Sequence, residues 1–150
     1  MTISIAAESP LSEDAHALIE GSEAALREVY SVDECFTFTA AELDEPSVTF
    51  FVARSDGVAL GCVALVDCGA YGEVKRLFVR TEARGKALAV RLMAALEAQA
   101  LAKGMQEMKL ETGDKLVAAV SLYRRLGYRE CGPFGAYELH PASLFMEKEL

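Results

Sequence analysis

The middle of the chain carries apolar runs that are typical of β-strands. Residues 48–54 (VTFFVAR) are rich in β-branched and aromatic side chains, and residues 58–66 (VALGCVALV) form a second apolar run. Because residues 55–57 (SDG) between them are a turn sequence, the two runs predict a β-hairpin. After the glycine-flanked residues 69–72 (GAYG), the segment 73–79 (EVKRLFV) predicts a further strand.

The second half of the chain alternates predicted helices with predicted strands. A long helix is expected to start near Gly85 and to end at Gly104, with Leu88, Leu92 and Leu96 repeating every four residues in an alanine-rich segment. The elements that follow are predicted to be a strand, a helix and two more strands, at residues 108–112, 115–126, 128–131 and 143–148.

The first third of the chain carries no recognisable motif. Residues 2–7 alternate weakly as a strand, and residues 12–30 have a helical pattern in which Gly21-Ser22 predicts a stop followed by a new helix start. The predicted order is β-α-α-β-β-β-α-β-α-β-β, which indicates an α/β chain with a mixed sheet and a right-handed crossover. A length of 150 residues, with no linker or repeat, predicts one domain over residues 1–150.

Composition and charge exclude several classes of function. A formal net charge of -8 disfavours contact with a phosphate backbone, so we expect no nucleic-acid partner. The sequence has no apolar run near the roughly 18 residues of a membrane span and no basic start typical of a signal peptide, so we expect a cytoplasmic protein with no membrane partner. Its four cysteines and two histidines lack metal-ligand spacing, so no metal is expected.

Positive charge is concentrated in the segment 73–91. This segment holds six basic residues against two acidic ones, a local charge of +4 in a chain of net charge -8. The charges surround the predicted junction of a strand with a helix N-terminus, where free backbone N–H groups and the helix dipole favour an anion. Gly85 and the small residues Ala87 and Ala89 leave room for a pyrophosphate there. The segment predicts a phosphate site, with an ordinary strand-to-helix turn as the alternative.

Two spaced motifs resemble the GNAT superfamily of acetyl-CoA-dependent N-acetyltransferases. The first is the strand-loop-helix segment with R-x-x-G/A-x-G/A at residues 84–89. The second is the later helix, which carries Ala119, Leu122-Tyr123 and Leu126-Gly127-Tyr128. The resemblance covers residues 48–128 and, more loosely, the whole chain. It implies a mixed, mostly antiparallel central sheet flanked by helices, and the closing residues 133–141 resemble a small bacterial branch whose acceptor is unknown.

The resemblance implies a binding site for acetyl-CoA as co-substrate. The backbone of Leu77, Phe78 and Val79 would pair with the pantetheine arm. The main chain of the motif would hold the pyrophosphate, through Arg84, Gly85, Lys86, Ala87, Leu88 and Ala89. Two residues depart from the family pattern, since Ala87 stands where the family prefers glycine and Leu116 where many members carry asparagine.

The same resemblance implies two catalytic residues. Tyr123 matches the tyrosine that lies near the sulfur and can protonate the leaving thiolate, and Glu73 lies where some members keep a glutamate as general base. Each has a structural alternative, since Tyr123 can be a half-buried core residue and Glu73 a solvated strand end. Because Lys75 and Arg76 alternate along the strand, one is expected to face the substrate and the other the opposite layer or solvent.

We therefore expect an N-acetyltransferase that passes acetyl from acetyl-CoA directly to a primary amine in a ternary complex, without a covalent enzyme intermediate. A small-molecule amine is the expected acceptor, with a peptide amine as the alternative, and a homodimer is compatible with the sequence. The rival functions are a non-catalytic acyl-CoA-binding regulatory domain and a protein lysine or N-terminal acetyltransferase. The acidic remainder of the chain could attract a cationic acceptor, although surface solubility explains it equally well.

Overall fold

A computed structural model describes residues 2–31, 39–85 and 87–150 of the chain. Seven strands form one sheet in the order β1-β2-β3-β4-β5-β7-β6. The strands are β1 (Ile3–Ala7), β2 (Val48–Ser55), β3 (Val58–Asp67), β4 (Tyr71–Val79), β5 (Glu107–Gly113), β6 (Arg129–Cys131) and β7 (Ser143–Glu149). The helices are α1 (Glu13–Arg27), α2 (Ala40–Leu43), α3 (Leu88–Ala102) and α4 (Val117–Arg125), with a short 3-10 turn at Thr81–Ala83. Strands β4 and β5 run parallel, and the other neighbouring pairs run antiparallel.

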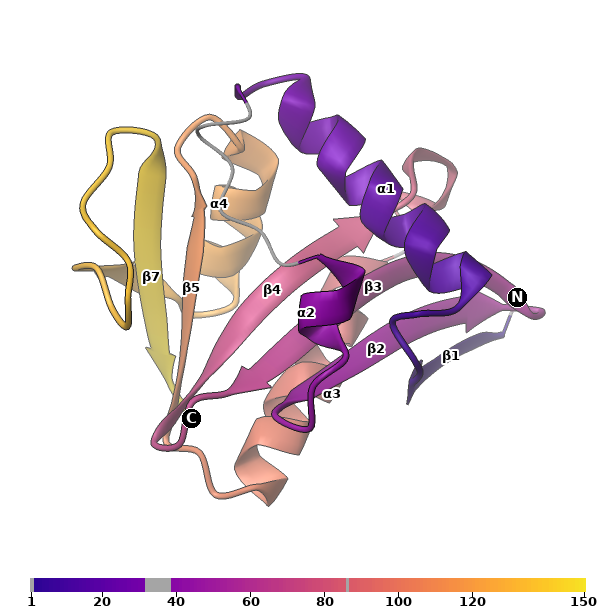
Figure 1. The fold of residues 1–150 in the computed structure, drawn as a ribbon, viewed down its shortest axis with the longest axis horizontal. Coiled ribbons are helices and arrows are strands. Elements are labelled where there is room, and N and C mark those ends of the chain that lie inside the picture. Colours follow the sequence, from indigo (N-terminus) through magenta and orange to yellow (C-terminus); the bar gives the residue numbers. More distant parts are fainter. Residues whose placement is uncertain (1, 32–38, 86) are drawn as a thin grey trace.

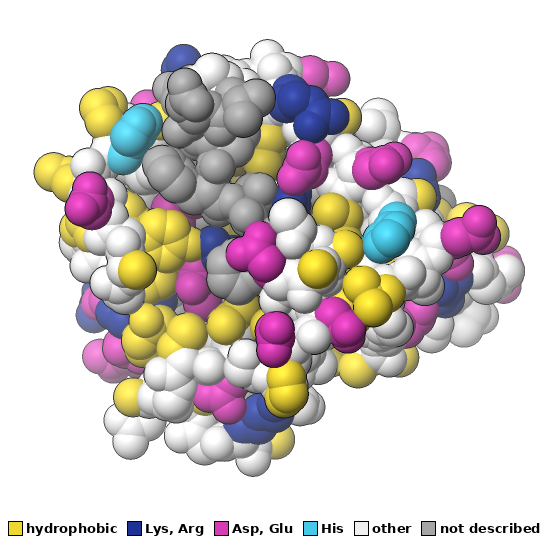
Figure 2. Space-filling view, viewed as in Figure 1, with side chains coloured by type: hydrophobic (Ala, Val, Ile, Leu, Met, Phe, Trp, Pro, Cys, Tyr) yellow, Lys and Arg dark blue, Asp and Glu magenta, His cyan; other side chains and the backbone are white. Residues whose placement is uncertain are grey.

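The helices cover both faces of the sheet and bury a core on each. Helices α1 and α2 lie on the near face in Figure 1, and α3 and α4 lie behind the sheet. Leu18 of α1 and Leu43 of α2 are buried on the near side, and Leu92 and Leu96 of α3 are buried on the far side. Figure 2 shows that acidic and basic side chains are interspersed on the near face. The predicted element order and the mixed, mostly antiparallel sheet are confirmed, and none of the described helices is long and apolar enough to cross a membrane.

The predicted helix break at Gly21-Ser22 is wrong, because α1 continues through both residues. A Cβ atom on Gly21 would lie 2.8 Å from the ring of Phe78, so glycine here lets α1 approach β4 closely. The Ser22 hydroxyl starts no helix and instead accepts a hydrogen bond of 3.2 Å from Arg76. The order still holds two helices before β2, because a short helix that was not predicted, α2, lies there and is capped by Thr39 through reciprocal side-chain to backbone hydrogen bonds.

The sheet opens between β4 and β5 midway along their length. Their register pairs run from Tyr71 opposite Glu107 to Val74 opposite Leu110, where the ladder ends. Figure 1 shows the two strands diverging beyond this point. The ladder between β4 and β5 therefore ends at Val74, and the described strands provide no partner for Leu77, Phe78 and Val79 on the side that faces β5.

A β-bulge in β4 lies next to this opening. Cys62 of β3 pairs with Phe78 and Ala64 pairs with Lys75, so β4 carries one extra residue between the two pairs. Arg76 at the bulge has a left-handed backbone with φ of 57°. Because the bulge interrupts the alternation of the strand, neighbouring side chains of β4 can point to the same face of the sheet.

Candidate active site

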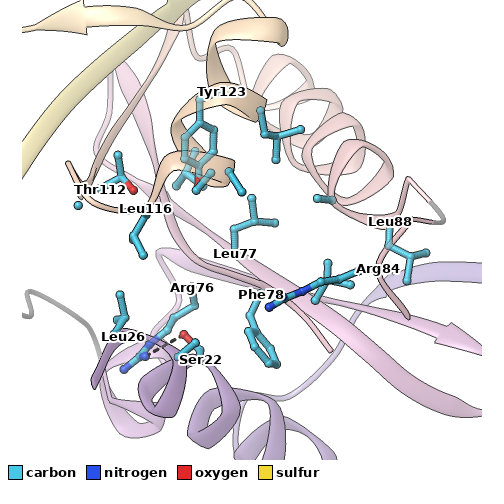
Figure 3. Close-up of a pocket in the computed structure, with 18 of the residues that line it drawn as sticks. Ser22, Leu26, Arg76, Leu77, Phe78, Arg84, Leu88, Thr112, Leu116 and Tyr123 are labelled. Atoms are coloured by element: carbon cyan, nitrogen blue, oxygen red, sulfur yellow. Dashed lines mark hydrogen bonds between the residues drawn. The ribbon is translucent and has the colours of Figure 1, made fainter. Parts of the chain in front are cut away.

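A cavity of about 720 Å³ occupies the space between the diverging strands β4 and β5. Its walls come from these two strands, from the N-terminal ends of α3 and α4, and from the end of α1. In Figure 3, Arg84 and Leu88 lie at the α3 end of the cavity, and Thr112 and Leu116 lie at the end formed by β5 and α4. The structure thus brings both predicted motifs to one cavity.

The α3 end of the cavity has the geometry of an anion cradle. The first hydrogen bond inside α3 runs from the Arg91 N–H to the Ala87 carbonyl at 3.1 Å, and no side chain of a described residue caps the helix. The N–H groups of Leu88, Ala89 and Val90 therefore have no partner within the helix and are available to an anion. Lys86, which was predicted to join this site, lies outside the described residues.

The backbone before α3 delays the start of the helix. Gly85 and Ala87 both adopt left-handed conformations, with φ of 86° and 57°, so α3 begins at Leu88 and not near Gly85 as predicted. Glycine enters this region freely, whereas alanine does so at a cost of about 1 kcal/mol. A glycine preference at the position of Ala87 therefore has a backbone cause as well as a steric one.

Strand β4 presents its open edge along the cavity. Phe78 and Val79 pair with Cys62 and Gly61 of β3 on one side, and the side that faces β5 is unpaired. Together with Leu77, they line the cavity. An extended ligand can hydrogen-bond to such an edge as an added strand would. The geometry is thus compatible with the expected pairing of this segment with a pantetheine arm.

Tyr123 points from α4 into the cavity (Figure 3). Its side chain is nearly buried, and burial together with the negative charge of Glu111 raises the pKa of the phenol. The hydroxyl therefore stays protonated at neutral pH. A protonated phenol beside the cavity can donate a proton to a group formed there.

Glu73 is buried beside the cavity rather than in its wall. Its carboxylate accepts a hydrogen bond of 2.6 Å from the Tyr137 hydroxyl and lies 3.1 Å from the Lys75 ammonium. The Lys75 ammonium also donates a hydrogen bond to the Tyr137 hydroxyl, which closes a three-membered cluster. Glu73 is thus not a solvated strand end, and it is not among the described residues that line the cavity.

Glu111 is a carboxylate in the cavity wall that the sequence analysis did not select. It lies on β5 and accepts a hydrogen bond of 2.8 Å from the Ser143 hydroxyl of β7. Burial raises the pKa of this carboxyl, opposed by the Ser143 hydrogen bond and by the charge of Lys75, and assisted by the charge of Glu73. The alternation along residues 108–112 could have indicated this position. Met108 and Leu110 are buried in the core, so Glu111 faces the opposite side of the strand.

The expectation that Lys75 and Arg76 face opposite layers is wrong, because the bulge turns both toward the α1 side. Lys75 joins Glu73 and Tyr137, and its side chain also lines the cavity. The Arg76 guanidinium is buried against α1, where it donates to Ser22 and lies 2.6 Å from the Glu23 carboxylate. These contacts hold α1 over the open part of the sheet.

The start of α4 is fixed by a residue from the other side of the opening. Tyr30, just beyond α1, donates a hydrogen bond of 2.9 Å to Asp114, and its hydroxyl accepts one of 2.6 Å from the Lys115 N–H. Leu116, at the position where many family members carry asparagine, provides no side-chain cap for α4. The cavity wall at this end is therefore apolar at Leu116 and polar at Tyr30.

The remaining candidate groups lie outside the cavity wall. The Tyr128 hydroxyl donates to Glu97 of α3 at 2.9 Å, and the His140 ring accepts from the Ala142 N–H at 3.0 Å. Burial raises the pKa of the Cys62 thiol to about 12, so it is no nucleophile at neutral pH. Within the described part of the chain, no group of three or more His, Cys, Asp or Glu side chains could hold a metal ion.

Comparison with known proteins identifies the family. The Acetyltransferase (GNAT) family model matches residues 15–128. An IAA acetyltransferase of Azospirillum brasilense is 40% identical over 150 residues, covering 99% of this chain and 98% of the relative. A Klebsiella pneumoniae structure assigned as an acyl-CoA N-acyltransferase is 34% identical with a TM-score of 0.84, covering 99% of this chain and 98% of that one. The chain belongs to the GNAT acetyltransferase family, and it is an acyltransferase.

The same fold recurs at much lower sequence identity. PaiA N-acetyltransferase of Thermoplasma acidophilum, solved in complex with coenzyme A, has a TM-score of 0.78 at 18% identity and covers the whole of both chains. This likeness concerns the fold alone.

Proposed function

We propose that this chain is an N-acetyltransferase that moves an acetyl group from acetyl-CoA directly to a primary amine, within a ternary complex. The observation that carries the proposal is that one cavity combines an uncapped helix N-terminus and an open strand edge with a protonated phenol and a carboxylate. The helix N-terminus and the strand edge fit a ligand with a pyrophosphate and an extended amide arm. The phenol and the carboxylate fit proton transfer.

Acetyl-CoA supplies the thioester on which the reaction depends. The main chain from Arg84 to Ala89 would hold its pyrophosphate, and the Leu77–Val79 segment would hold its pantetheine arm. A Cβ atom on Gly85 would meet no atom within 4 Å, so the space beside this turn is open. An open turn, free N–H groups and the positive charge of Arg84 fit the phosphate groups.

Tyr123 has the properties required of the acid. A thiolate leaving group needs a proton or a hydrogen-bond donor, and the raised pKa of Tyr123 keeps its phenol protonated for that purpose. The negative charge of Glu111 acts on this phenol. Tyr123 and Glu111 both line the cavity.

Two carboxylates are candidates for the base that removes a proton from the acceptor. Glu111 lines the cavity and can receive the proton directly, whereas Glu73 would act from behind Lys75 and Tyr137 through a water molecule. We assign the direct role to Glu111, and keep Glu73 as the alternative base and as the residue that orients Lys75 and Tyr137.

The test is release of free thiol from acetyl-CoA with a panel of amines and a panel of peptides, together with calorimetry of acetyl-CoA binding. We expect binding below millimolar concentration and amine-dependent thiol release, with small amines preferred. IAA belongs in the panel because the Azospirillum relative is named for it. Binding without thiol release from any acceptor would support the non-catalytic alternative, and absence of binding would refute the proposal.

A further inference from the structure

Glu111 lies in the cavity wall, where β5 contributes to it. Its carboxylate has no ionic partner among the described residues. It accepts a hydrogen bond from the neutral Ser143 hydroxyl, and it takes part in none of the ion pairs formed by described residues. A half-buried carboxylate without a counter-ion is stabilised when a cation enters beside it. Glu111 therefore favours a positively charged acceptor.

The two basic residues of β4 in the cavity wall, Lys75 and Arg76, are already engaged. Lys75 pairs with Glu73 and donates to Tyr137, and only 7% of its side chain is exposed. Arg76 pairs with Glu23 and Ser22, and 1% of its side chain is exposed. A ligand carboxylate would have to displace an internal carboxylate from either of them.

Two further lysines are also engaged elsewhere. Lys109, on the same strand as Glu111, pairs with Glu147 at 2.9 Å, and Lys115 lies over the ring of Tyr30 at 5.5 Å. Arg84 and Arg125, which line the cavity, sit before α3 and in the last turn of α4.

We propose that the acceptor is a primary amine whose ammonium group pairs with Glu111 and which carries no carboxylate beside that amine. This inference rests on the proposed function and specifies its substrate class. A free α-amino acid would bring a second negative charge next to Glu111 and Glu73, where the Lys75 ammonium is already engaged. Decarboxylated amines lack this charge, as do the N-termini of peptides and amino-acid amides.

The reaction balances with these groups alone. The ammonium gives one proton to the Glu111 carboxylate and becomes a free amine. The amine nitrogen forms a bond to the acetyl carbon, the carbon–sulfur bond breaks, and the sulfur leaves with its electron pair and takes the Tyr123 proton. The proton that the new amide nitrogen loses returns the phenol to its starting state, and the Glu111 proton passes to solvent.

The experiment compares matched pairs that differ by one carboxylate beside the amine: phenethylamine with phenylalanine, tyramine with tyrosine, and agmatine with arginine. Thiol release from acetyl-CoA gives kcat/KM, and calorimetric titration into the enzyme with coenzyme A bound gives affinity without turnover. The amine of each pair is expected to have at least a tenfold advantage in both measurements. Because a decarboxylated amine is the stronger base and less of it is free amine at neutral pH, basicity works against the expected result.

Two variants show whether Glu111 is the origin of the preference. In Glu111→Gln the advantage in affinity should fall below about threefold, whereas Glu107→Gln, on the same strand but outside the cavity wall, should keep it. Equal affinity within the pairs, tighter binding of the amino acids, or no binding of any amine overturns the inference. Preferential binding of the amines without thiol release refutes the proposed function and leaves this inference standing.

Discussion

The hydroxyl of Tyr137 donates a hydrogen bond of 2.6 Å to the carboxylate of Glu73, across 64 positions of sequence. The loop before β7 is thereby attached to the centre of β4. Burial, followed by the Glu73 hydrogen bond and charge, raises the pKa of the Tyr137 phenol. Glu73 is consequently held in a fixed position by a neutral donor and by the Lys75 ammonium, and a proton taken by Glu73 would weaken both contacts.

Replacement of Glu111 and of Glu73 by glutamine should have different effects on kcat/KM. Glu111→Gln should lower kcat/KM by about 10²-fold at neutral pH, with partial recovery at high pH as more acceptor is already free amine. Glu73→Gln should lower kcat/KM by less than about tenfold, with the shape of the pH profile unchanged, because it disturbs positioning and not proton transfer. The reverse pattern in a steady-state pH series would make Glu73 the base.

The pH profile of kcat/KM should also shift when Ser143 is replaced by alanine. The Ser143 hydrogen bond lowers the pKa of Glu111 against the effect of burial, so its removal raises that pKa further. A base acts only when deprotonated, and the rising acid limb of kcat/KM in Ser143→Ala should therefore shift to higher pH. Ser55→Ala, a buried serine of β2 outside the cavity wall, should not shift it.

Removal of the Tyr123 hydroxyl should reduce turnover with little effect on binding. Loss of a general acid costs about 10² to 10⁴ in rate, so Tyr123→Phe should show a fall of this order in kcat. Its affinity for acetyl-CoA, measured by calorimetry, and its circular dichroism spectrum should stay near those of the unchanged protein. A fall in kcat of less than about threefold would assign thiolate protonation to another group or to water.

Glycine at position 87 should stabilise the protein. Ala87 has φ of 57°, so Ala87→Gly removes left-handed strain and should raise the free energy of unfolding by about 1 kcal/mol in urea titrations. Ala89→Gly is the matched control, because this residue lies inside the first turn of α3 and should lose about 0.5 to 1 kcal/mol. Equal effects of the two changes would contradict the backbone explanation.

Alanine at position 21 should destabilise the protein although it replaces a glycine inside a helix. The added Cβ would lie 2.8 Å from the Phe78 ring, and overpacking of this kind costs about 1 to 3 kcal/mol, more than the roughly 1 kcal/mol gained in helix propensity. In a Phe78→Leu background the same change should become neutral or stabilising. Urea denaturation of the unchanged protein, Gly21→Ala, Phe78→Leu and the double variant measures the free energy of unfolding that decides this.

The order of elements could be predicted from the sequence because it depends on local patterns. Apolar runs, glycine positions and the small residues Gly85, Ala87 and Ala89 are visible without any tertiary contact. Gly21 was misinterpreted for a physical reason: glycine ends helices and also permits close packing, and only the Phe78 ring decides between the two.

The surroundings of Glu111 and Glu73 could be predicted much less well. Glu111, Ser143 and Tyr137 come from segments that meet only in the folded structure, and the bulge at Arg76 changes which side chains of β4 share a face. Strict alternation was assumed for Lys75 and Arg76, and one extra residue in the strand is enough to invalidate it. The Tyr30 to Asp114 hydrogen bond likewise joins residues 84 positions apart.

The short parallel ladder between β4 and β5 makes the molecule two half-sheets joined at four register pairs. A ligand that hydrogen-bonds along the free edge of β4 would take the place of a neighbouring strand. Ligand binding would then extend the hydrogen bonding of the sheet. Thermal stability is then a function of ligand concentration, since anything that binds the folded state alone raises the melting temperature.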